Sequence, residues 1–148
     1  MSAAAAMAAI LAALPLPAPP PAPVHAEAKE WAVEASPHGA GAAAIELHLT
    51  ARAGYHVNLD YPAAFVPSAE GTVRFESARV PLKPSSTAPC QGKAGEVCSA
   101  SFVLPYSPPA AGPVRVAGTF AFSVCTAERC LIEKVPVSVS AVPAPGRG

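Results

Sequence analysis

Four cysteines are the residues of this 148-residue sequence best suited to chemistry. They form two local pairs: Cys90 and Cys98 have seven residues between them, and Cys125 and Cys130 have four. An even number of cysteines is typical of disulfides in an exported protein. Three connectivities are open, and the short spacings favour the two local pairs. Structural zinc sites prefer two to four residues between paired ligands, so the Cys90 and Cys98 spacing fits zinc poorly and we expect no metal.

The segment from Cys125 to Cys130 is suited to a disulfide across a hairpin. A four-residue loop can close a hairpin in which the Cβ atoms of the two flanking residues lie about 4.5 to 5.5 Å apart. This separation is close to that of a disulfide. A ring of six residues contributes only about 2 kcal/mol, so such a bridge can open at little cost to the fold. Spacing alone leaves a structural and a redox role open. Arg129 favours a thiolate at Cys130, whereas Glu128 opposes it.

The segment from Cys90 to Cys98 favours a structural bridge. The intervening QGKAGEV contains two glycines that can turn the chain back on itself. A ring of nine residues closes locally and contributes about 2 to 3 kcal/mol. We therefore expect a structural disulfide between Cys90 and Cys98.

The elements that must position these cysteines are predicted to be strands. Seven segments show apolar and polar alternation or strand-forming residues between turn signals: 30–36, 44–52, 57–59, 72–75, 100–104, 114–124 and 131–142. About seven strands with regular turns predict an all-β domain, an immunoglobulin-like antiparallel β-sandwich. Prolines cannot donate to a β-ladder, and five of them restrict the middle third to loops and edge strands: Pro62, Pro67, Pro81, Pro84 and Pro89.

The first 26 residues differ from the rest, because they are rich in Ala and Pro and carry no Lys, Arg, Asp or Glu. The apolar stretch 2–16 is too short for a membrane anchor and is typical of a signal peptide, with a cleavage site after Ala26 and a domain over 27–148. The usual positive charge before the apolar stretch is missing, and a disordered Ala/Pro tail is the alternative. We expect a periplasmic or otherwise exported protein with no membrane span in the mature chain.

Charge and motifs exclude several function classes. Ten cationic and ten anionic residues cancel, and the Lys and Arg residues are spread singly, so we expect no nucleic-acid partner. No Ser-His-Asp arrangement, phosphate-binding glycine loop or paired-carboxylate motif indicates hydrolysis. His56 has no second ligand at metal spacing and is interpreted as a structural residue beside a turn, and Trp31 as a core anchor.

The chain resembles the amino-terminal periplasmic domain of the DsbD thiol:disulfide interchange protein family. Five stretches between residues 30 and 142 carry the likeness: GYHVN at 54–58, GEV at 95–97, SFVLPY at 101–106, GPVRVAGTFAFSVCTAERC at 112–130 and VPVSVSAV at 135–142. The first is similar to a Gly-aromatic-His-hydrophobic-Asn segment of that family. The most specific element is the F-x-x-C-x4-C pattern that ends at Cys130.

The resemblance implies that Cys125 and Cys130 form a redox-active pair on neighbouring strands of an immunoglobulin-like sandwich. Cys130 would attack a partner disulfide and Cys125 would resolve the mixed disulfide, with no cofactor. The implied partners are a thioredoxin-like protein or a DsbD-like membrane redox protein. In the family an aromatic loop covers the disulfide, whereas the matching stretch 90–93 has no aromatic and adds a cysteine pair. The alternative is a non-catalytic secreted β-sandwich for binding or assembly, with two structural disulfides.

Overall fold

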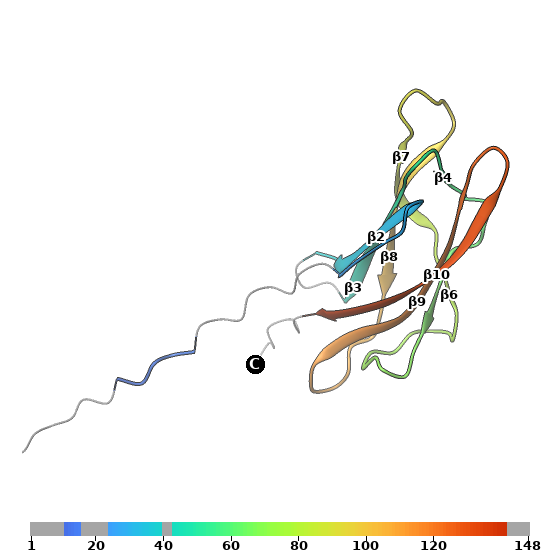
Figure 1. The fold of residues 1–148 in the computed structure, drawn as a ribbon. Helices are drawn as coiled ribbons and strands as arrows, with labels where there is room; N and C mark the ends of the chain where they lie inside the picture. Colours follow the sequence, from blue (N-terminus) through green and yellow to red (C-terminus); the bar gives the residue numbers. More distant parts are fainter. Residues whose placement is uncertain (1–10, 16–23, 40–42, 142–148) are drawn as a thin grey trace, which may run out of the picture.

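The computed structural model describes residues 11–15, 24–39 and 43–141, and within them the regular structure is entirely β. The strands follow one another along the chain (Figure 1): β1 (Val24–Glu27), β2 (Trp31–Pro37), β3 (Ala44–Ala51), β4 (His56–Val57), β5 (Ala64–Pro67), β6 (Val80–Pro81), β7 (Pro84–Pro89), β8 (Val97–Pro105), β9 (Val114–Cys125) and β10 (Cys130–Ala141). The predicted all-β class is confirmed. The sequence patterns missed the short strands β1, β5, β6 and β7.

The strands form two antiparallel sheets with one hydrophobic cluster between them. One sheet has the order β1-β2-β3-β8-β7, and the other has the order β10-β9-β5-β6, with β4 also paired to β9. Side chains from both sheets contribute to the buried cluster, as in a β-sandwich. The predicted β-sandwich is therefore confirmed, and the immunoglobulin-like topology stays a prediction.

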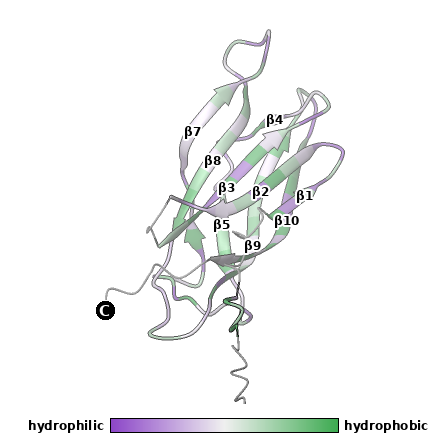
Figure 2. Ribbon diagram, turned by 90° about the vertical axis from the view of Figure 1, so that its left-hand side faces the viewer, coloured by the Kyte–Doolittle hydropathy of each residue, from purple (hydrophilic) through white to green (hydrophobic). Residues whose placement is uncertain are grey.

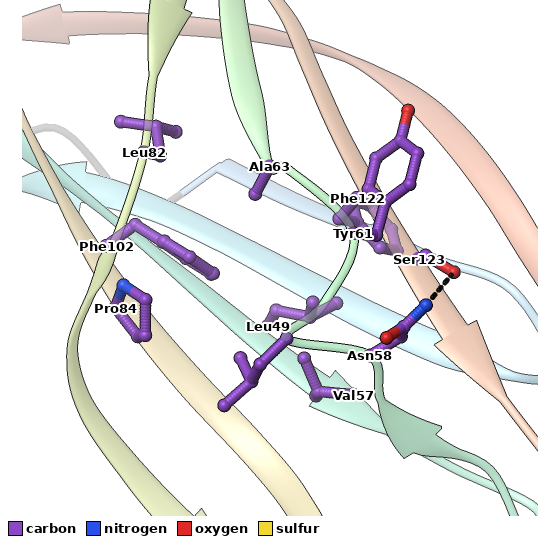
Figure 3. A pocket seen from close by; sticks show the side chains of 11 residues that line it. Leu49, Val57, Asn58, Tyr61, Ala63, Leu82, Pro84, Phe102, Phe122 and Ser123 are labelled. Carbon is purple, nitrogen blue, oxygen red and sulfur yellow. Dashed lines mark hydrogen bonds between the residues drawn. The ribbon is translucent and has the colours of Figure 1, made fainter.

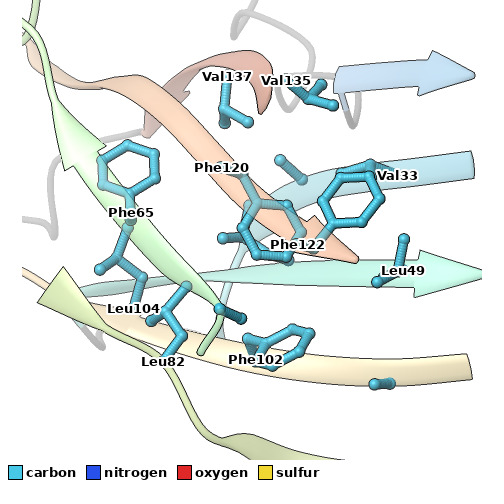
Figure 4. Close-up of a cluster of buried hydrophobic side chains, with 14 of the residues drawn as sticks. Val33, Leu49, Phe65, Leu82, Phe102, Leu104, Phe120, Phe122, Val135 and Val137 are labelled. Atoms are coloured by element: carbon cyan, nitrogen blue, oxygen red, sulfur yellow. The ribbon is translucent and has the colours of Figure 1, made fainter. Parts of the chain in front are cut away.

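Aromatic side chains join the two sheets at the centre of the core (Figure 4). The ring centroids of Phe102 on β8 and Phe120 on β9 lie 5.5 Å apart. Trp31 on β2 meets Phe122 on β9 edge-on at 5.3 Å. Such aromatic pairs contribute about 0.5 to 1.5 kcal/mol beyond the burial of their area. Trp31 is buried, so its predicted role as a core anchor is confirmed.

The alternation of apolar and polar residues in the sequence of β3 matches an alternation of buried and half-buried side chains in the structure. Ile45, Leu47 and Leu49 are fully buried, whereas Glu46 and His48 between them are half-buried. Side chains two residues apart on a strand share a face, which explains the pattern. Figure 2 shows the same contrast, with hydrophobic colour along the long strands and hydrophilic colour towards several loops.

The proline-rich middle of the chain supplies one edge strand of each sheet. β6 ends one sheet and β7 ends the other, as Pro81, Pro84 and Pro89 predict. All six residues of β7 are exposed, and the strand is pale in Figure 2. A proline at the outer edge interrupts no ladder between neighbours, so these strands can end a sheet without extending it.

The predicted strand over residues 72–75 is wrong. The structure has only an isolated bridge between Arg74 and Ser107 at this point. Val73 and Phe75 are partly buried against the core, and the Phe75 ring lies 5.5 Å from that of Phe65. Their alternation therefore reflects a loop that packs its apolar side chains on the core without forming a strand.

Strand β1 spans the predicted cleavage position between Ala26 and Glu27, and it pairs with β2 over its full length. The Arg52 guanidinium donates a hydrogen bond of 2.6 Å to the Glu27 carboxylate and holds the pKa of that exposed carboxyl below its usual range. Most of the predicted apolar signal segment lies outside the described residues, and the signal peptide stays a prediction.

Candidate functional site

The hairpin of β9 and β10 carries Cys125 and Cys130 directly opposite each other. The two residues form a disulfide with their Cα atoms 4.0 Å apart. The structure thus contains the local bridge that the spacing favours. The two strands stay paired over twelve positions from this bridge to the far end of the sandwich, so the ladder does not depend on the disulfide alone.

Thr126 closes the turn between the two cysteines. Its backbone N–H donates to the carbonyl oxygen of Arg129 at 2.7 Å. Its side-chain oxygen accepts hydrogen bonds from the backbone N–H groups of Glu128 and Arg129, both at 3.2 Å. A Thr hydroxyl commonly stabilises a turn in this way. The loop that separates the cysteines is therefore held by local hydrogen bonds.

The two cysteines differ in their access to solvent. Cys125 is 5 % exposed, whereas Cys130 is exposed. The difference follows from the topology, because β9 has β10 on one side and β4 on the other, while β10 is the edge strand of its sheet. Attack by a thiolate requires access to the sulfur, and of the two residues Cys130 is the more accessible.

Strand β4 brings polar side chains beside Cys125. His56 is opposite Cys125, and the register continues to Asn58, whose backbone N–H donates to the Ser123 carbonyl oxygen at 2.9 Å. Because alternate residues of a strand share a face, these side chains lie with Cys125 on the face opposite Phe122. Sequence reasoning treated His56 as structural only, and the structure places it next to the disulfide.

Ser123 is a buried polar residue in direct contact with the disulfide. It is 2 % exposed, and its Oγ lies 3.9 Å from the Sγ atom of Cys125. Asn58 Nδ2 donates to the same Oγ at 3.4 Å, as Figure 3 shows. Sequence reasoning missed Ser123, although a residue two positions before Cys125 on a strand must share its face.

Arg129 links the turn between the two cysteines to Tyr55. It lies in the turn before β10, and its guanidinium donates to the Tyr55 hydroxyl through Nε at 3.0 Å and also through Nη2. Its Cζ atom lies 5.8 Å from the Tyr55 ring centre, within cation–π range. Tyr55 is buried, so Arg129 attaches the hairpin to the sandwich, and its effect on a thiolate at Cys130 stays a prediction.

The second disulfide joins Cys90 and Cys98 in the hairpin between β7 and β8, with Cα atoms 4.7 Å apart. Figure 1 shows this hairpin projecting from the same end of the sandwich as the turn between β9 and β10. Gly92 and Gly95 have positive φ values of 74° and 84°, which favour glycine. The predicted local pairing and the turning role of the glycines agree with the structure.

The segment 55–58 lies between the two disulfides. The Sγ atom of Cys98 is 3.9 Å from the Tyr55 carbonyl oxygen. Glu96 Oε2, in the loop between the second pair of cysteines, lies 3.9 Å from Nδ1 of His56. The stretch that the resemblance matches to an aromatic cap therefore belongs to a neighbouring hairpin and leaves Cys130 exposed.

The cavities near these residues are small. A pocket of about 20 Å³ borders Asn58 and Ser123 and is lined by Leu49, Phe102 and Phe122 among others (Figure 3). This volume accommodates a single water-sized molecule. A larger hollow of about 160 Å³ lies beside Tyr106, past the other end of β8, where burial raises the pKa of the Tyr106 phenol. Neither of these two hollows is lined by a cysteine.

Among the residues that the structure describes, no group of three or more His, Cys, Asp or Glu side chains is arranged to hold a metal ion. That part of the chain also has no helix with the length and apolar character needed to cross a membrane. No family model, curated protein or solved structure matches the chain. The disulfide geometry and the sequence resemblance are the basis of a functional proposal.

Proposed function

We propose that this protein is an exported thiol:disulfide relay module that exchanges electrons through Cys125 and Cys130, as the amino-terminal domain of the DsbD family does. The observation that carries the proposal is the asymmetry of this disulfide. Cys130 is exposed at the edge strand, and Cys125 is buried between two strands. This arrangement suits a reaction in which the partner forms a mixed disulfide with Cys130. Cys125 is then the leaving group when the bridge opens and the attacking group when the bridge forms again.

The relay requires two consecutive exchange steps. A thiolate of a reducing partner attacks Cys130 Sγ, a new sulfur–sulfur bond forms to the partner, and the Cys125–Cys130 bond breaks with its electron pair on Cys125. Cys125 is left as a thiolate. A second thiolate of the partner then attacks the partner's own sulfur in the mixed disulfide and releases Cys130 as a thiolate, so the partner is oxidised and this protein carries two reduced cysteines. The reverse sequence reduces a second partner's disulfide.

The fold is suited to repeated opening of this bridge. The ring contributes about 2 kcal/mol in the chain-entropy model, a small part of the roughly 5 to 15 kcal/mol that stabilises a typical domain. β9 and β10 also remain joined by their ladder and by the aromatic core beneath β9. The reduced protein is therefore expected to keep the sandwich.

The proposed partners are a thioredoxin-like protein and a DsbD-like membrane redox protein. Their chemistry fits an exposed sulfur beside an apolar side chain. Ile132 shares the face of Cys130 on β10 and is 61 % exposed. An exposed apolar side chain next to a reactive sulfur supports a partner contact at this point of the hairpin.

Export is part of the proposal, since disulfides persist in oxidising compartments. We expect the protein from its native host to begin near Glu27. Intact-mass measurement tests this expectation. A mature form that retains Met1 would remove the argument for export and for an oxidising environment.

A glutathione redox titration of the purified protein, followed by alkylation and mass spectrometry, tests the function. The expected midpoint for Cys125 and Cys130 lies above about −300 mV, the level below which structural disulfides typically lie. Circular dichroism should show the same strand content before and after reduction. If the bridge opens only when the protein unfolds, the relay is excluded and the alternative, a non-catalytic β-sandwich with two structural disulfides, takes its place.

A further inference from the structure

The buried hydroxyl of Ser123 is oriented towards the sulfur of Cys125. Its Oγ lies 3.9 Å from that Sγ atom. A disulfide sulfur carries no hydrogen, so the hydroxyl is the donor and the sulfur the acceptor. Ser123 is 2 % exposed, which leaves bulk water little access to compete for this contact. A buried polar group of this kind is retained only when it has partners.

Asn58 fixes the direction in which the hydroxyl donates. Its Oδ1 accepts a hydrogen bond from the backbone N–H of Asp60 at 3.1 Å, which sets the orientation of the amide. Its Nδ2 then donates to Ser123 Oγ at 3.4 Å (Figure 3). Since a lone pair of the hydroxyl oxygen is occupied by this donor, the hydroxyl hydrogen is free to point at Cys125.

We propose that Ser123 stabilises Cys125 as a thiolate each time the disulfide opens, and that Asn58 is the positioning residue for Ser123. The inference rests on the proposed relay function. When an incoming thiolate bonds to Cys130, the electron pair of the broken bond goes to Cys125, next to the Ser123 hydroxyl. A hydrogen bond to an ionised acceptor is about twice as strong as one to a neutral acceptor. The contact therefore favours the open form over the disulfide.

The same contact serves the return step. Thiolates, and not thiols, attack disulfides, so a donor that keeps Cys125 ionised also prepares it to attack the mixed disulfide at Cys130. The burial of Cys125 disfavours the charge, and Ser123 offsets part of this penalty. The pair is thus divided into an exposed sulfur that meets the partner and a buried sulfur with its own hydrogen-bond donor.

The test compares three variants with the wild-type protein in a glutathione titration. Ser123→Ala removes the donor, and we expect the equilibrium constant for reduction to fall about tenfold, which is a midpoint about 30 mV more negative. Asn58→Asp provides a carboxylate that accepts the Ser123 hydroxyl hydrogen, and we expect a shift in the same direction. The control is Ser101→Ala, because Ser101 is also buried and its hydroxyl pairs with His48 at 2.8 Å on the other sheet. The control should keep the wild-type midpoint.

The outcomes separate this inference from the proposed function. If the wild-type bridge resists reduction in the folded protein, the relay itself fails and this inference fails with it. If the wild-type bridge titrates as expected but Ser123→Ala keeps the wild-type midpoint, only the role of Ser123 is overturned. A shift in Ser101→Ala equal to that in Ser123→Ala would also overturn it, because the effect would then reflect loss of any buried hydroxyl. An unchanged midpoint in Asn58→Asp would overturn the positioning role of Asn58.

Discussion

The two disulfide hairpins at one end of the sandwich close short rings in different surroundings. Cys125–Cys130 joins the interior strand β9 to the edge strand β10, so one cysteine is buried and the other exposed. Cys90–Cys98 joins the edge strand β7 to β8 at their turn, and both of its cysteines are half-buried. Ring size alone does not distinguish the two bridges, whereas position in the sheet does.

The polar atoms beside the sulfurs differ as well. The Cys125 sulfur faces the hydroxyl of Ser123, which can donate to a thiolate. The Cys98 sulfur faces the carbonyl oxygen of Tyr55, which carries partial negative charge and would repel a thiolate. We therefore expect a thiolate to be stabilised at Cys125 and disfavoured at Cys98. This contrast leads to four predictions, given in order of decreasing effect.

The largest effect is expected in partner capture by single cysteine variants. Cys125→Ala leaves the exposed Cys130 free to form a mixed disulfide with a thioredoxin-like partner. Cys130→Ala leaves only the buried Cys125, and we expect it to capture roughly tenfold less or lower still, because access limits the attack. Non-reducing electrophoresis with mass identification measures the two yields. Equal capture by both variants would contradict the assigned roles.

The order of reduction should separate the two bridges in the wild-type protein. As the redox potential is lowered, we expect Cys125 and Cys130 to be reduced and alkylated first. The disulfide between Cys90 and Cys98 should stay intact until the potential falls below about −300 mV. Peptide mapping after alkylation follows both pairs in one experiment. If both disulfides had the same reduction midpoint, the proposed difference between the two bridges would be wrong. Recovery of Cys90 linked to Cys125 would show instead that the two hairpins exchange disulfides.

Removing the second bridge should affect stability and not the redox reaction. The double variant Cys90→Ala/Cys98→Ala is expected to lose about 2 to 3 kcal/mol of unfolding free energy, because its open ring of nine residues restores entropy to the unfolded chain. Urea unfolding measures the loss, and a glutathione titration should give the wild-type midpoint for Cys125 and Cys130. A shifted midpoint would show that the second bridge tunes the first.

The smallest effect concerns Tyr55, which contacts both hairpins. Tyr55→Phe keeps the ring and removes the hydroxyl that accepts from Arg129, with an expected loss of roughly 1 kcal/mol in unfolding free energy. Arg129→Ala and the double variant complete a thermodynamic cycle that isolates the pair. A coupling energy near zero would mean that the contact does not anchor the hairpin of Cys125 and Cys130.

Much of the fold could be predicted from the sequence, because alternation and turn chemistry are local properties. Long stretches of strand-forming residues such as those of β3, β9 and β10 predict strands, and the structure contains them, with one buried face in β3 and with both faces largely buried in β9. Short strands were missed where pairing with a neighbour, and not the local pattern, forms the strand. The stretch 72–75 shows the converse error, since alternation there arose from a loop packed on the core.

Gly118 illustrates what a local pattern cannot supply. A Cβ atom at this position of β9 would lie 2.3 Å from the Val66 carbonyl oxygen and 2.6 Å from the Phe65 ring. The glycine is needed because β5, the antiparallel neighbour of β9, lies very close at this point, which is a property of two strands about fifty residues apart. In the sequence, Gly118 only interrupts the pattern of strand-forming residues in β9. Nothing nearby in the sequence indicates that β5 is the reason for this glycine.

For the site, the sequence by itself determined that two short cysteine rings can close and favoured this pairing, since spacing and turn residues decide whether a short ring can close. Only the tertiary structure decided which sulfur is exposed and which polar groups lie beside it. Asn58 and Ser123 are separated by 65 residues, and they meet because β4 pairs with the end of β9. Exposure and hydrogen-bond partners depend on which strand lies alongside, and that neighbour is chosen by packing of the whole core and not by the residues nearby in sequence.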